Sequence, residues 1–279
     1  MIPLLGAALA GAGLVGGYII ATARQRRHEA LRSLPFPQSW EQILERNVKH
    51  YPLLPPFLAN ELRQNVQIFL AEKNFEGCGG LEVTEEMKVT VAGLACLLLL
   101  NRKTSHYKDL STVLLYPKAY RVSNASSDGV TVSEQFQGRL GESWESGTVV
   151  LSWSDVSSSA HNIKDGHNLV LHEFAHQLDQ EDGRGDGVPI FDQESMYTTW
   201  AEVLSPEYEK LRKRAAKGKP SVLDEYGATN PAEFFAVATE TFFEKPSQLK
   251  AKHAALYEEL AEYYRVDPAS WNASSAAKP

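Results

Sequence analysis

Two histidines and a glutamate stand close enough in this sequence to act on one metal ion. His172, Glu173 and His176 form the pattern His-Glu-x-x-His. On an α-helix, residues four apart lie on one face about one turn apart, so both imidazoles can direct a ring nitrogen at the same ion. Zinc suits two neutral imidazoles plus a carboxylate, with a fourth position left for water. The pattern therefore predicts a hydrolytic zinc site in which Glu173 accepts a proton from that water.

The residues around the motif favour a buried helix over the alternative, a surface helix that carries two histidines by chance. The apolar positions of this stretch are Leu169, Val170, Phe174, Ala175 and Leu178. We expect a helix from about Asn168 to Gln180, with its apolar body in the core. Asp179 lies seven residues after His172, close to two turns along the same face. It is expected either to hydrogen-bond a ligating histidine or to end the helix in solvent.

The third ligand has to come from a carboxylate further along the chain. A motif with three histidines would need Gly at 179 and His at 182, and both positions are Asp. The downstream glutamates with suitable spacing are Glu194, Glu202, Glu233 and Glu240. Of these, Glu233 has the most defined setting, because Asn230-Pro231-Ala232-Glu233 predicts the N-cap and first turn of a helix. The local sequence leaves two roles open for Glu233, a metal ligand or part of a capping box.

Several blocks of sequence carry a resemblance to a known family. They are Gly141–Trp144, Gly147–Trp153, Gly166–Asp179, Gly187–Pro189 and Tyr226–Glu233. Together they closely resemble the Mlc titration factor A family of zinc peptidases, and a looser similarity extends from about Leu34 to Asp267. The resemblance implies a zincin-like fold related to the catalytic domain of anthrax lethal factor, with Zn2+ as the cofactor. It also implies that Glu233 is the third ligand and that Tyr226 helps to stabilise the transition state. Without the resemblance, Tyr226 would be interpreted as an ordinary half-buried aromatic residue.

Two functions from different classes follow from this resemblance. The first is a zinc metallopeptidase, acting as an aminopeptidase or short-peptide hydrolase on a peptide substrate, with Glu173 as general base and Tyr226 hydrogen-bonded to the oxyanion. The second is suggested by the family name, which records binding to a transcriptional repressor and thus a regulatory role in sugar uptake. In that alternative the chain is a non-catalytic, sequestering protein with a structural zinc site. An intact Glu173 favours the enzyme, because a structural site needs ligands but no base.

Along the chain the sequence predicts helices first, then strands, then helices again. Helical patterns are expected within 40–100, strands at 112–116, 130–136 and 148–153, and further helices at 195–217, 231–244 and 250–264. This order predicts an α+β fold, a zincin-like metallopeptidase domain at 34–270 with a helical N-terminal part and a small mixed sheet. The strand 148–153 is expected either at an edge, where it could pair with an extended substrate, or in the core.

An apolar helix is expected in front of this domain. Residues 2–23 carry no charge, and a run of 22 residues is long enough to cross a bilayer. Three arginines follow at once, Arg24, Arg26 and Arg27, which would hold the next residues in the cytoplasm. We therefore predict a membrane anchor at 1–27, with the catalytic domain at the cytoplasmic face of a bacterial inner membrane. A cleaved signal peptide and a purely cytoplasmic protein are the alternatives.

The composition argues against further classes of protein. The 279-residue chain has a formal net charge of −7, so no direct binding of nucleic acid is expected. Its two cysteines are too few for a disulfide scaffold. The last residues, 271–279, are small and polar and are predicted to form a disordered tail.

Overall fold

A computed structural model describes residues 22–118 and 147–271 of the chain. Its α-helices are α2 (Gln38–Asn47), α3 (Pro56–Glu72), α4 (Glu85–Leu97), α6 (Trp153–His161), α7 (Leu169–Asp179), α8 (Glu194–Ala215), α9 (Pro231–Glu244), α10 (Pro246–Lys252) and α11 (Ala254–Tyr264). Its strands are β1 (Asn74–Gly77), β2 (Thr112–Tyr116) and β3 (Thr148–Ser152). Short 3-10 helices lie at η1 (Tyr51–Leu53), η2 (Glu225–Ala228) and η3 (Pro268–Ser270). The fold is mixed α/β and mostly helical.

The sheet within the described residues has the strand order β1-β2-β3, and both pairings are parallel. This part of the sheet is therefore parallel rather than mixed, and the expected strand at 130–136 lies outside the described residues. The strands expected at 112–116 and 148–153 are confirmed, whereas β1 falls within 40–100, where helical patterns were expected. Alternate residues of β2 and β3 are fully buried, among them Val113, Leu115 and Val149, as expected for strands covered on one face by helices.

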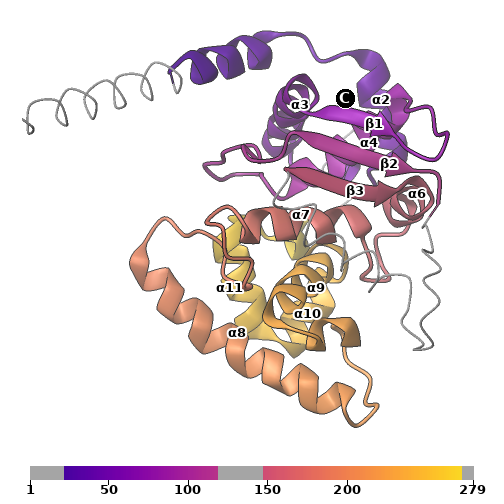
Figure 1. The fold of residues 1–279 in the computed structure, drawn as a ribbon. Coiled ribbons are helices and arrows are strands. Elements are labelled where there is room, and N and C mark those ends of the chain that lie inside the picture. The colour runs from indigo at the N-terminus through magenta and orange to yellow at the C-terminus, as the bar shows by residue number, and fades with distance from the viewer. Residues whose placement is uncertain (1–21, 119–146, 272–279) are drawn as a thin grey trace, which may run out of the picture.

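Helix α7 lies between the two halves of the molecule. Figure 1 shows the sheet with α2, α3 and α4 on one side of α7, and α8 to α11 on the other. Helix α7 contacts α4, α6, α9 and β3, which explains why its apolar residues are buried on nearly every side. The central helix of the fold is thus the one that carries the His-Glu-x-x-His motif.

Two helical regions differ from the expectation. Residues 153–161 form α6, which begins where the sequence suggested that a strand ends; the Ser152 hydroxyl caps it by accepting from the Asp155 N–H at 3.3 Å. The single helix expected at 250–264 is two helices, α10 and α11, which meet at His253. The helices expected at 168–180 and 231–244 are present as α7 and α9.

The predicted membrane anchor is contradicted. Within residues 22–118 and 147–271, no helix is both long and apolar enough to cross a bilayer, and positions 2–21 of the expected anchor lie outside this part. From residue 22 to 33 the chain is helical, but this helix carries the arginines, and two of them bind the domain. Arg24 Nη2 lies 2.8 Å from Glu72 Oε2, and Arg27 Nη2 donates to the Ala71 carbonyl at 3.0 Å. These arginines contact the end of α3, so the inner-membrane location inferred from them is withdrawn.

Candidate metal centre

Helix α7 places both histidines of the motif on one buried face. The Asn168 side chain caps the helix by accepting from the Leu171 N–H at 3.1 Å, which fixes where the first turn starts. His172 is 7% exposed and His176 is 1% exposed. Their rings are 4.9 Å apart between centroids, and their Nε2 atoms approach to 3.2 Å. Two imidazole nitrogens therefore converge on one small volume, as the spacing of four predicts.

Helix α9 brings a carboxylate to the same volume. The Asn230 side chain accepts from the Glu233 N–H at 2.9 Å, and Pro231 occupies the first turn. The predicted helix start is therefore confirmed. Asn230 caps the helix while the Glu233 carboxylate lies against the histidines. Glu233 Oε2 is 3.1 Å from His172 Nε2 and 3.5 Å from His176 Nε2.

These three side chains fit a divalent metal ion. One ligand atom from each of His172, His176 and Glu233 lies within 4.8 Å of the others. The separations of 3.1, 3.2 and 3.5 Å match the edge of a ligand tetrahedron around zinc, about 3.3 Å for bonds of about 2.0–2.1 Å. All three residues are buried. Among the described residues this is the group of histidine, cysteine and acidic side chains that could hold a metal, and Glu194 and Glu202 of α8 are not part of it.

Glu240 has a place in the site that the sequence did not predict. It was expected as a possible third ligand, but its Oε1 lies 2.8 Å from Nδ1 of His172, on the far side of the ring from Glu233. A carboxylate only accepts, so His172 Nδ1 donates this hydrogen bond, and in the neutral ring the lone pair is then on Nε2. The other oxygen of Glu240 accepts from the Asn168 N–H. The available signal was spacing, because Glu240 follows Glu233 by seven residues and lies on the same face of α9.

A second buried carboxylate continues this network. Glu244 accepts from the Asn168 amide at 3.0 Å and from the Gly166 N–H at 3.0 Å. Burial raises the pKa of Glu244 to about 9. The segment that enters α7 is thereby hydrogen-bonded to α9 at several points, so the two helices that carry the cluster are held together next to it.

The glutamate of the motif lies in a dry setting. Glu173 is 4% exposed, and its Oε2 is buried with no hydrogen-bond partner in the described part of the chain. Burial is the main cause that raises the pKa of Glu173 to about 7; His172 opposes the shift, and Glu233 and Glu240 add to it. A carboxyl group that titrates near neutral pH can both accept and return a proton.

Tyr226 and Asp179 lie at the margins of the cluster. The Tyr226 ring is half-buried on η2 and its centroid is 6.1 Å from that of His172; the Asp224 carboxylate accepts from the Tyr226 N–H at 2.8 Å. The Asp179 carboxylate accepts from the Gly187 N–H at 2.9 Å. Asp179 thereby ties a glycine-rich loop to the end of α7, a role that neither expectation for this residue named.

Gly187 lets that loop pass close to the start of α9. It has φ +81°, and a Cβ atom there would lie 2.5 Å from the Pro231 carbonyl oxygen. The Gly187 carbonyl accepts from Trp200 Nε1 at 3.0 Å. This close approach packs the loop against the turn that carries Glu233, and only glycine permits it.

A buried histidine pair on one helix, a carboxylate from a second and a glutamate inside the motif define a class, the metallopeptidases. Within this class the family is clear. The model of the family described as glucose-regulated metallo-peptidase M90 matches residues 22–265, and the chain belongs to that family. Membership implies a metal ion, and the cluster of His172, His176 and Glu233 is a group that could bind it.

Curated relatives cover most of the chain. An uncharacterized protein of Synechocystis sp. (strain ATCC 27184 / PCC 6803 / Kazusa) is 40% identical over 244 residues, which is 87% of this chain and 89% of that protein. Mlc titration factor A of Klebsiella pneumoniae (strain 342) is 33% identical over 82% of this chain and 86% of its own length. Mlc titration factor A of Yersinia pestis (strain Pestoides F) is 31% identical over 86% and 90%. The resemblance inferred from the motif blocks is therefore confirmed.

Proposed function

We propose that this protein is a zinc-dependent metallopeptidase that hydrolyses peptide bonds, with Glu173 as its general base. The observation that carries the proposal is the convergence of His172, His176 and Glu233 within 4.8 Å, beside a buried glutamate whose pKa is raised to about 7. A structural metal site needs the three ligands but has no use for that glutamate. Family membership supports the same class of reaction.

Each residue of the site has a defined task in this proposal. His172, His176 and Glu233 would hold zinc, which supplies Lewis acidity to a water molecule and to the peptide carbonyl. Glu173 accepts the proton that the water loses as it attacks, and returns it to the leaving amine. Tyr226 donates a hydrogen bond from its hydroxyl to the oxyanion that forms on the carbonyl. Glu240 keeps His172 in the tautomer that can bind metal. We further propose that the substrate is a short peptide, cleaved as an aminopeptidase would cleave it.

The test compares the full chain with its Glu173→Gln variant on a panel of fluorogenic aminoacyl and peptidyl substrates. We expect the wild-type protein to hydrolyse members of the panel when loaded with zinc, and the variant to bind zinc but lose hydrolysis. Glu202→Gln, at an exposed position of α8, is the matched control and should behave as wild type. Normal turnover by Glu173→Gln would show that Glu173 is not the base.

A second candidate function rests on the name of the relatives, Mlc titration factor A. We propose that the chain can also bind a transcriptional repressor, whether or not it is an enzyme. Pull-down of purified Mlc by the zinc-loaded protein and by Glu173→Gln tests this. Equal binding by both proteins, with no hydrolysis by either, would favour a sequestering role; failure of both to bind would remove this candidate.

A further inference from the structure

A cavity lies away from the metal centre, where the N-terminal helical segment meets α3, α4 and β1. Its volume is about 500 Å³, within the range of about 300–1,000 Å³ that small-ligand sites occupy. None of the residues that line it belongs to α7, α9 or η2. Figure 1 places α3 and β1 on the opposite side of the sheet-containing half from α9. The cavity is therefore not part of the proposed catalytic site.

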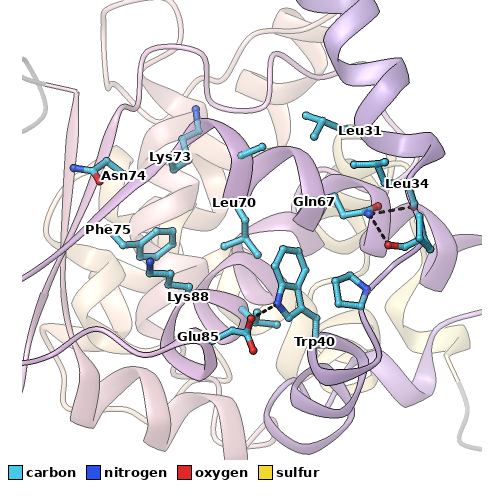
Figure 2. A pocket seen from close by; sticks show the side chains of 14 residues that line it. Leu31, Leu34, Trp40, Gln67, Leu70, Lys73, Asn74, Phe75, Glu85 and Lys88 are labelled. Carbon is cyan, nitrogen blue, oxygen red and sulfur yellow. Dashed lines mark hydrogen bonds between the residues drawn. The ribbon is translucent and has the colours of Figure 1, made fainter.

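The walls of this cavity are mainly apolar. The large apolar side chains that line it are Leu31, Leu34, Trp40, Leu70, Phe75 and Val89. Figure 2 shows Leu70 near the centre of the cavity wall, with Trp40 below it and Leu31 and Leu34 at the upper right. Leu34 is 56% exposed, an unusual exposure for a large aliphatic side chain that lines a cavity. Such a surface gains free energy when an apolar group covers it.

Most polar groups in the lining are already hydrogen-bonded within the protein. Trp40 Nε1 donates to Glu85 Oε1 at 2.7 Å, and Gln67 Nε2 donates to the Leu34 carbonyl at 3.2 Å, contacts that Figure 2 draws as dashed lines. Lys73 Nζ is buried and donates to the Leu110 carbonyl at 2.8 Å. Because these groups already make hydrogen bonds within the protein, they do not determine which ligand binds.

Lys88 is the exception. It lines the cavity and is half-buried on α4, one turn after Glu85. Figure 2 shows its side chain extending from α4 toward the ring of Phe75. Among residues 22–118 and 147–271 the Lys88 ammonium has no ion-pair or hydrogen-bond partner, although the backbone N–H of Lys88 donates to the Thr84 carbonyl at 3.2 Å. A cation that has lost part of its hydration and has no counter-charge is stabilised by an anion placed next to it.

We propose that this cavity binds a small anionic amphiphile, an aliphatic chain that ends in one carboxylate. The chain would lie against Leu34, Trp40 and Leu70, and the carboxylate would pair with the Lys88 ammonium. An uncharged lipid would leave the ammonium without a partner, and a small anion without a chain would leave the apolar wall in water. Among the described residues that line the cavity, the apolar side chains and the unpaired Lys88 ammonium together select this class of ligand.

The test is calorimetric titration of the full chain with decanoate, below its micellar concentration. Decanol and decyltrimethylammonium serve as probes with the same chain and a neutral or positive head. We expect saturable one-to-one binding of decanoate, and affinity for the other two that is weaker by about tenfold or more, because the charge-assisted hydrogen bond to Lys88 is missing.

Variants locate the binding. Lys88→Gln should reduce decanoate affinity by about tenfold, whereas Lys88→Arg and the exposed control Lys164→Gln should retain it. Leu70→Asn should also weaken binding, since it removes apolar wall without touching the cation. Decanoate bound at the metal centre would be unaffected by Lys88→Gln and Leu70→Asn. Three results would overturn the proposal: equal decanoate binding by wild type and Lys88→Gln, equal binding of decanol and decanoate by the wild type, or no binding of decanoate at all.

Discussion

The contact between Glu240 and His172 gives a prediction whose size follows from hydrogen-bond chemistry. In the wild-type protein Glu240 accepts twice, from His172 Nδ1 at 2.8 Å and from the Asn168 N–H at 2.5 Å. Glutamine is nearly the same shape but has one acceptor and one donor group. If the glutamine oxygen faces His172, the glutamine NH2 faces the Asn168 N–H, so two donors face each other and no hydrogen bond forms between them. If its NH2 faces His172, it donates to Nδ1 and leaves the proton on Nε2, where the metal must bind.

Either orientation of Glu240→Gln costs metal affinity. Loss of a carboxylate that orients a ligating histidine lowers metal affinity about 10- to 100-fold, which is about 1.4–2.7 kcal/mol. We expect a loss in this range for zinc. The assay is competition against a chromophoric zinc chelator at fixed pH, with Glu202→Gln as the matched control on α8. Unfolding of the metal-free variants by urea shows whether each remains folded. Zinc affinity within twofold of wild type, in a folded Glu240→Gln protein, would refute the positioning role of Glu240.

Three further predictions address other parts of the molecule. Glu72 is partly buried, which alone would raise its pKa, but hydrogen bonds from Arg24 and His28 lower the pKa to about 2. The contribution of Glu72 to the free energy of unfolding is therefore full above pH ~4.3 and is lost as the pH falls toward 2. Glu72→Gln should flatten that part of a urea-stability profile against pH, and an unchanged slope would exclude the pairing. Gly187→Ala should lower the free energy of unfolding in urea by about 2 kcal/mol, because an alanine would be strained at φ +81° and its Cβ would lie 2.5 Å from the Pro231 carbonyl oxygen. A change below about 0.5 kcal/mol would contradict this. Tyr226→Phe should lower kcat by about 100-fold with zinc affinity unchanged, whereas an unchanged kcat would make Tyr226 a packing residue.

The helices that carry the cluster were predictable because local chemistry defines them. Asn230 was predicted as an N-cap and Asn168 as the approximate start of a helix, and both cap their helices in the structure. The apolar periodicity that follows each one indicates which face is buried. The spacing of His172 and His176 then determines their convergence. The choice of Glu233 over the other glutamates needed the family resemblance, because the relative placement of α7 and α9 is a tertiary property.

Elements with weak local signals were missed. Strand β1 is four residues long and mostly exposed, so no alternation of apolar residues marks it; it exists because it pairs with β2. Helix α6 is rich in serine, a residue without strong helix preference, and buries only Val156 and Ala160. The anchor at 1–27 was predicted from the length of the apolar stretch and from the arginines that follow it. The contacts of Arg24 and Arg27 with α3 are long-range pairings that a sequence does not reveal.

The assignment of His172, His176 and Glu233 as zinc ligands can be tested by a crystal structure of the zinc-loaded full chain, with data collected on both sides of the zinc absorption edge. We expect one strong anomalous peak bounded by His172 Nε2, His176 Nε2 and the Glu233 carboxylate, with bonds of about 2.0–2.2 Å. A peak elsewhere on the chain, or zinc held without Glu233, would contradict this assignment.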